Sequence, residues 1–269
     1  MLVLGLKPKP FNHIAVVEFE GQIGPRIKAG DYVKLLRSIE ENDRIKSVVL
    51  DIDSPGGSAT ASNYLHLAAQ ELAKRKPVVA FIRGLGASGA YLFACPAARI
   101  VAIPGSLVGS IGVISMHPLL HEALGRVGVR METTKSAELK DIGSMFREPT
   151  DEERAKEQEL VDDLYGQFIA AVAEGRHLTE AQVRAAATGE VFTGRKAKEL
   201  GLVDELGNLE RALDLAAELG NVTRHPVWMK PRRGLRDLLP GAVASMLVGE
   251  IAAAVEERIS ARYLFQYRP

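Results

Sequence analysis

The chain has 269 residues, of which 46% are hydrophobic and 25% are charged, as is ordinary for a folded globular protein. Basic and acidic residues number 34 each, so the formal net charge is zero and gives no argument for a nucleic-acid partner. A single cysteine, Cys95, excludes a disulfide bond within the chain.

Short apolar runs alternate with helix-compatible segments through the first half of the chain. The runs predict strands over residues 13–21, 47–53, 78–82, 99–103, 111–115 and 129–133. Helices are predicted after a cap at Asp31 and over residues 60–76, 88–94 and 117–127. Strands that alternate with helices imply an α/β fold with a mostly parallel sheet and crossover helices.

The second half is predicted to be mainly helical. Thr150 and Glu153 form the pattern of a capping box at the start of a long helix over residues 150–174. Thr179 opens a second helix, and residues 209–219 form a third. We expect residues 1–225 to be a single α/β domain, helical from about residue 150, with residues 226–269 as a separate tail.

The tail is basic and then apolar. Four basic residues precede the apolar run 238–248, namely Lys230, Arg232, Arg233 and Arg236. Two interpretations stay open, a helix that packs in the core or at an oligomer interface, and a segment that lies on a membrane surface. No run of 18 apolar residues predicts a transmembrane helix, and the location stays open between membrane-associated and cytoplasmic.

Two glycine-rich turns follow two of the predicted strands. Ser54-Pro55-Gly56-Gly57 ends one strand, and the turn that contains Ser88 and Gly89 ends the next. A strand, a glycine turn and a helix together aim backbone N–H groups at one point, which can stabilise an oxyanion. Small residues also let a helix approach a sheet closely, so either turn alone is equally compatible with packing.

A serine nucleophile at position 88 needs a base. None of the six histidines stands in an obvious triad signature, and the best candidate among them is His117. The alternative is Lys140, in a polar segment with little helical character. A lysine amine accepts a proton near neutral pH only where burial lowers its pKa, and the sequence alone does not distinguish Lys140 from a surface lysine.

The turns belong to a longer series of motifs. These are Ser54-Pro55-Gly56-Gly57, Ala87-Ser88-Gly89-Ala90-Tyr91, Gly109-Ser110-Ile111-Gly112-Val113, the segment from Lys135-Ser136 to Lys140-Asp141-Ile142, residues 191–197 and residues 201–207. In this order and spacing the chain, from about residue 13 to residue 219, resembles the signal peptide peptidase A family of serine proteases. The resemblance implies the Clp protease/crotonase-like fold.

The resemblance also implies roles for individual residues. Ser88 matches the nucleophile, Lys140 matches the base of a Ser-Lys dyad, and Ser110 matches a serine whose hydroxyl orients the lysine amine. Matches to the oxyanion-hole positions are Gly56 and Gly89, with Gly57 as a near alternative to Gly56. The chain departs from the family at Asp53, where asparagine is more frequent, and at Ala90, which replaces a common glycine.

Substrates and partners follow from the same resemblance. It implies an endopeptidase that needs no metal or cofactor and degrades cleaved signal peptides and other apolar, extended peptides. It implies a ring-like homo-oligomer whose active sites are shared or walled by neighbours. Family members usually have an N-terminal membrane anchor, and we do not find one in this sequence.

Three other hypotheses stay open at this level. A crotonase-type acyl-CoA hydratase or isomerase shares the superfold and the oxyanion hole, but would use carboxylates as acid and base. A catalytically silent scaffold would tolerate Ser88→Ala. A Clp-type Ser-His-Asp peptidase would depend on His117 and tolerate Lys140→Ala.

Overall fold

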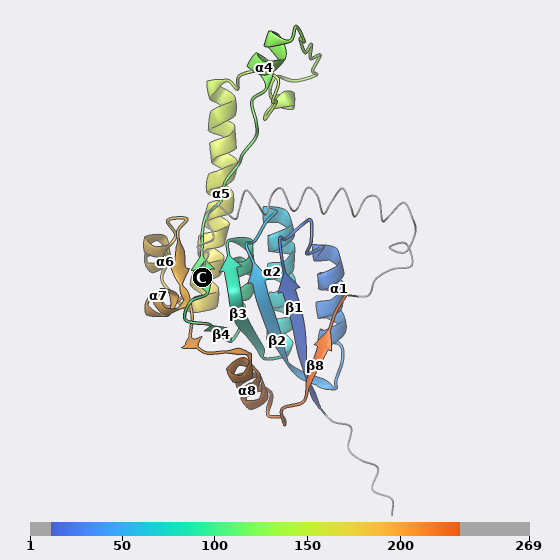
Figure 1. The fold of residues 1–269 in the computed structure, drawn as a ribbon, viewed down its shortest axis with the longest axis vertical. Coiled ribbons are helices and arrows are strands. Elements are labelled where there is room, and N and C mark those ends of the chain that lie inside the picture. Colours follow the sequence, from blue (N-terminus) through green and yellow to red (C-terminus); the bar gives the residue numbers. More distant parts are fainter. Residues whose placement is uncertain (1–11, 232–269) are drawn as a thin grey trace, which may run out of the picture.

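The structure, a computed structural model, describes residues 12–231. Its centre is an eight-stranded sheet in the order β6-β5-β3-β2-β1-β8, from which β4 branches to pair with β3 and β7 (Figure 1). All pairs are parallel except β5 with β6. The strands are β1 (His13–Glu20), β2 (Ile45–Ser54), β3 (Val78–Ala87), β4 (Arg99–Ala102), β5 (Leu107–Gly109), β6 (Val191–Thr193), β7 (Glu205–Leu206) and β8 (Pro226–Met229).

Helices cover both faces of the sheet. On one face α1 (Ala29–Glu40), α2 (Ala59–Arg75) and α3 (Gly89–Ala94) pack over a large core that contains Leu50 and Phe93. On the other face α8 (Leu209–Gly220) packs over a smaller core around Val49. Because successive strand residues point to opposite faces, β2 contributes to both cores along one apolar run.

A projection leaves the body of the protein beside the sheet (Figure 1). It consists of residues 112–149, with α4 (His121–Arg126) and the 3₁₀ helix η1 (Glu138–Asp141), and of the first half of α5 (Asp151–Arg176). We call this projection the arm. The second half of α5 anchors the arm, because Phe168, Ile169 and Val172 are buried in the large core, which α6 (Glu180–Ala186) and α7 (Gly194–Glu199) complete.

The structure confirms the α/β fold class, the mostly parallel sheet, the capping box of Thr150 and Glu153, and the helix that begins after Thr179. The strands expected over residues 111–115 and 129–133 are wrong, since neither segment has regular secondary structure and all of their residues except Ile111 lie in the arm. The helix expected over residues 117–127 shortens to α4. The cap expected at Asp31 is also wrong, because α1 begins at Ala29 and Asp31 lies in its first turn.

The end of the described chain returns to the sheet. Residues 226–229, which we expected to start the tail, form β8 and pair in parallel with β1. The boundary at residue 225 therefore does not separate the tail from the α/β domain. The apolar run 238–248 lies outside the described residues, and no helix within residues 12–231 is both long enough and apolar enough to cross a membrane.

Candidate active site

Ser88 occupies a sharp turn between β3 and α3. Its backbone has φ 52° and ψ −127°, in a region that residues other than glycine rarely adopt. The turn is held by the backbone N–H of Ser88, which donates to the carbonyl of Gly109 at 2.8 Å. A strained turn from a strand into a helix exposes a serine hydroxyl at the end of a sheet, as in the nucleophile elbow of hydrolases.

The turn after β2 lies directly against Ser88. Gly56 and Gly57 have φ values of 87° and 151°, which favour glycine. A Cβ atom on Gly56 would lie 2.6 Å from the backbone nitrogen of Gly89 and 3.0 Å from Cβ of Ser88. The two glycine turns that the sequence indicated are therefore in contact, and this close approach requires the absence of a side chain.

The backbone N–H groups of the glycines at this contact differ in whether they find an acceptor among the described residues. The N–H of Gly56 donates to Oγ of Ser54 at 3.2 Å, so it is already engaged. Within residues 12–231 no acceptor is found for the N–H of Gly57 or for that of Gly89, the first residue of α3. Of the three glycines expected to supply oxyanion donors, Gly57 and Gly89 thus have N–H groups that are available to a ligand.

Neighbouring residues support the Ser88 turn from two sides. Ser110 follows the carbonyl that binds Ser88, has φ 49° and donates its N–H to the carbonyl of Glu190 at 2.6 Å. Asp53 accepts a hydrogen bond from the N–H of Leu85 at 2.9 Å, three residues before Ser88. Both contacts fix the backbone on either side of the elbow.

A cavity of about 380 Å³ opens beside Ser88. Its wall is made by α2, α3, α5 and the start of the arm, and the described residues that line it include no aspartate, glutamate, lysine or arginine. Their polar side chains are hydroxyls, amides and one imidazole. The lining side chains that bear on the argument are Ser62, His66, Leu67, Leu92, Leu164 and Phe168.

His66 lines the cavity, although our sequence analysis preferred His117 among the histidines. Its Nδ1 atom lies 2.9 Å from the carbonyl oxygen of Leu92, which can only accept, so Nδ1 carries the proton. Burial lowers the pKa of His66. A signal was present in the sequence, because His66 follows Ser62 by four residues and so lies on the same face of α2.

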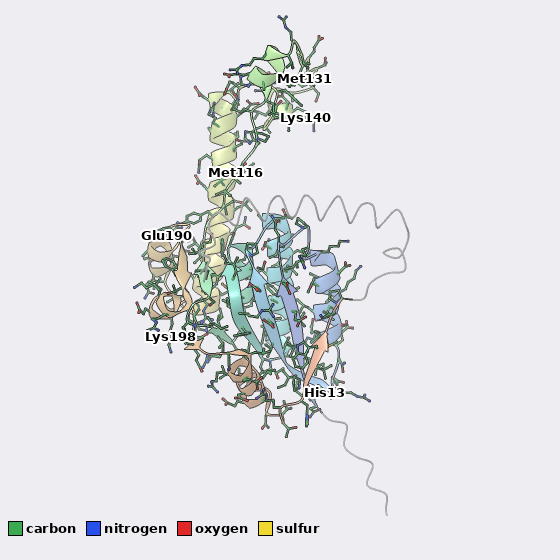
Figure 2. The ribbon with its side chains drawn as sticks, viewed as in Figure 1. His13, Met116, Met131, Lys140, Glu190 and Lys198 are labelled. Carbon is green, nitrogen blue, oxygen red and sulfur yellow. The ribbon has the colours of Figure 1, made fainter. Side chains whose placement is uncertain are left out.

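Lys140 and His117 both belong to the arm, and neither lines the cavity beside Ser88. Figure 2 shows Lys140 in the arm, away from the sheet. Lys140 belongs to η1. His117 places Nδ1 3.7 Å from Oε1 of Glu157 on α5. Within one chain the structure therefore brings Ser88, Gly56, Gly57, Gly89 and the Ser110 turn together, but neither candidate base.

The part of the chain that the structure describes contains no group of three or more histidine, cysteine, aspartate or glutamate side chains that could hold a metal ion. The chemistry available at the site is that of a hydroxyl, two free amides and a polar but uncharged cavity.

Comparison with known proteins gives one matching family model, described as peptidase family S49, over residues 70–223. A putative protease of Methanocaldococcus jannaschii is 42% identical over 192 residues, which are 71% of this chain and 62% of the relative. A putative protease of Synechocystis sp. is 39% identical over 221 residues, 82% of this chain and 79% of the relative. A putative signal peptide peptidase SppA of Enterococcus faecium is 35% identical over 188 residues, 68% of this chain and 54% of the relative.

Proposed function

This chain belongs to peptidase family S49, and we propose that it is a serine endopeptidase in which Ser88 is the nucleophile and Lys140 the general base. The observation that carries the proposal is the strained turn at Ser88, which lies against two unpaired N–H groups and beside a cavity. A hydroxyl next to two convergent amide donors is the arrangement that acyl transfer requires.

The reaction follows from these groups. The Lys140 amine removes the proton from Ser88, whose Oγ attacks the scissile carbonyl. The N–H groups of Gly57 and Gly89 stabilise the negative charge on the carbonyl oxygen. Lys140 then protonates the leaving amine, and water releases the acyl group from Ser88. The hydroxyl of Ser110 orients the lysine amine, as the family resemblance implies.

The base comes from a second copy of the chain. Lys140 lies in the arm of its own chain, away from the cavity, so an arm from a neighbour is the simplest source. The arm also exposes large apolar side chains, since Ile114, Met116 and Val127 are 76%, 83% and 72% exposed. Exposed apolar patches mark interaction surfaces, and a head-to-tail contact between copies closes into a ring.

The cavity favours uncharged side chains in the substrate. Among residues 12–231, none that lines it is charged, and burying a charge without a partner is costly. Extended, apolar peptides such as cleaved signal peptides fit this requirement, and one of the relatives is named as a signal peptide peptidase. We therefore propose such peptides as the substrate class.

A mixing experiment tests the shared site. Ser88→Ala and Lys140→Ala are each expected to abolish cleavage of a fluorogenic apolar peptide. Equal mixing of the two inactive proteins, after dissociation and reassembly, restores about a quarter of the wild-type sites if each site takes its serine and its lysine from different copies. His117→Ala serves as the control and is expected to remain active.

The outcomes separate the hypotheses. Failure of the mixture to regain activity would assign Ser88 and Lys140 to the same copy. Activity that survives Lys140→Ala but is lost with His117→Ala would replace the dyad by a Ser-His mechanism. An active Ser88→Ala variant would refute the proposed nucleophile.

A further inference from the structure

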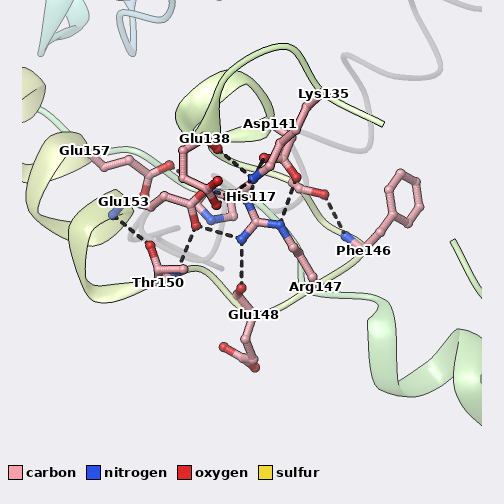
Figure 3. Close-up of polar contacts among 11 residues, drawn as sticks. His117, Lys135, Glu138, Asp141, Phe146, Arg147, Glu148, Thr150, Glu153 and Glu157 are labelled. Atoms are coloured by element: carbon pink, nitrogen blue, oxygen red, sulfur yellow. Dashed lines mark hydrogen bonds and ion pairs between the residues drawn. The ribbon is translucent and has the colours of Figure 1, made fainter. Parts of the chain in front are cut away.

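An ion-pair cluster surrounds the residue that follows Lys140 (Figure 3). Asp141, the last residue of η1, accepts hydrogen bonds from Nε and Nη2 of Arg147, both at 2.8 Å. The same carboxylate accepts from Nζ of Lys135 at 3.0 Å. The turn that carries Lys140 is thus held by two cations through its neighbour.

Arg147 makes a second two-point contact on its other side. Its Nη1 atom donates to Oε2 of Glu153 at 2.7 Å, and Nη2 donates to Oε1 of the same carboxylate. Glu153 is 2% exposed and also accepts from the N–H of Thr150 in the capping box of α5. One guanidinium therefore links the Lys140 turn to the first turn of the long helix.

This link is needed because the arm has little other regular structure. Residues 112–149 contain only α4 and η1, whereas α5 is anchored in the body by its second half. A planar guanidinium with five donors can bind two carboxylates in fixed orientation, which an ammonium group cannot do. The position of the Lys140 turn relative to α5 thus depends on Arg147.

We propose that Arg147 is a positioning residue for the base: it holds the turn that carries Lys140 against the start of α5, so that the amine is presented at a fixed place on the arm. The proposal rests on the proposed function, in which Lys140 is the base. It adds a residue that touches neither the peptide nor Ser88.

The charges of the cluster persist over the pH range in which a peptidase is assayed. The hydrogen bonds from Arg147 and Lys135 hold the pKa of Asp141 well below its usual range. Those from Arg147 and from the backbone of Thr150 lower the pKa of Glu153 to about 2. The charged or titratable side chains around the turn are Lys135, Glu138, Asp141, Arg147, Glu148, Glu153, Glu157 and His117.

The test compares Arg147→Gln with Arg154→Gln. Arg154 is a matched control, because it pairs with Glu148 on the surface at the start of the same helix. Displacement of a base by about 1 Å costs about 100-fold in rate, so Arg147→Gln is expected to lower kcat about 10–100-fold with KM unchanged. The Arg154→Gln control is expected to leave both constants as in the wild type.

The split between kcat and KM distinguishes a displaced base from a disturbed cavity. A displaced base lowers kcat and leaves KM as in the wild type, whereas a change in the cavity raises KM.

Chemical rescue completes the test and covers a variant that folds poorly. Arg147→Ala is assayed with added guanidinium at millimolar concentration, against sodium at the same ionic strength, and guanidinium is expected to restore kcat. Wild-type kcat in Arg147→Gln together with an inactive Lys140→Ala would overturn the proposal and leave the dyad intact. An active Lys140→Ala would instead overturn the proposed function itself.

Discussion

Substitution of Gly89 by alanine tests how closely the Ser88 turn is packed. A Cβ atom on Gly89 would collide with Oγ of Ser62 on α2 and would lie 2.6 Å from Cβ of the same residue. Rotation of the Ser62 hydroxyl cannot relieve the second contact, because Cβ does not move with χ1. The N-terminus of α3 must therefore shift, and the N–H of Gly89 shifts with it.

Gly89→Ala is expected to affect both folding stability and kcat, because Gly89 is tightly packed and is proposed to supply an oxyanion donor. Overpacking in a tight site costs about 1–3 kcal/mol of folding free energy. Misplacement of one oxyanion donor costs about 100- to 1,000-fold in kcat. Because the α5 side of the cavity and most of α2 stay in place, KM for a fluorogenic apolar peptide is expected to change less than kcat.

A double-mutant cycle makes the prediction specific. Ser62→Gly removes both atoms that the new Cβ would meet, at the cost of about 1 kcal/mol for a glycine in α2. In the double variant Gly89→Ala/Ser62→Gly, kcat is expected to lie within about tenfold of the kcat of Ser62→Gly alone. The two substitutions would then be coupled by more than about 1 kcal/mol. Additive losses in the double variant would refute the packing argument, and a fully active Gly89→Ala would refute the role of its N–H.

Three further predictions concern buried polar groups. Burial raises the pKa of Asp51 from 3.8 to about 6, so the folded protein loses stability as the pH rises through this window. In urea denaturation, Asp51→Asn is therefore expected to raise the free energy of unfolding by about 1–3 kcal/mol at pH 8 and by almost nothing at pH 4. An equal increase at both pH values would show that the buried charge of Asp51 is not the cause. Tyr91→Phe leaves the carbonyl of Leu202 without the hydroxyl that donates to it at 2.8 Å, and calorimetry should show a loss of about 1–3 kcal/mol. His66→Asn keeps a donor for the carbonyl of Leu92, which His66→Ala does not. In calorimetry the asparagine variant should therefore be more stable than the alanine variant by about 1 kcal/mol.

The glycine turns were predictable from the sequence for a physical reason. The φ of Gly56 is positive, and a Cβ atom there would lie only 2.6 Å from the backbone nitrogen of Gly89, so glycine is the residue that fits. The apolar runs before them form β2 and β3, because both faces of these strands are buried. Local sequence therefore predicted the two glycine turns that meet at Ser88, while the catalytic role of Ser88 stays a prediction.

The arm was not predictable in the same way. The apolar residues of segments 111–115 and 129–133 suggested strands, yet Ile114 and Met131 are exposed and neither segment pairs with a strand among residues 12–231. Periodicity indicates that a side chain is to be buried, but not whether its partner lies in the same chain. The position of His66 in the cavity was not predictable either, because it depends on how α2 and α3 pack against each other.

Separation of the two halves of the dyad would make hydrolysis depend on assembly. A lone chain would hold the nucleophile and both oxyanion donors, but its own Lys140 would remain in the arm. Activity per chain is therefore expected to fall as the protein is diluted through its dissociation range, because each site loses the neighbour that supplies its base. Activity per chain and molar mass by light scattering are measured over the same range of protein concentrations. The two quantities should fall with the same midpoint concentration. A dilution series in which the mass falls while activity per chain stays constant would show that a single copy is sufficient, and would return Lys140 to the chain that carries the serine.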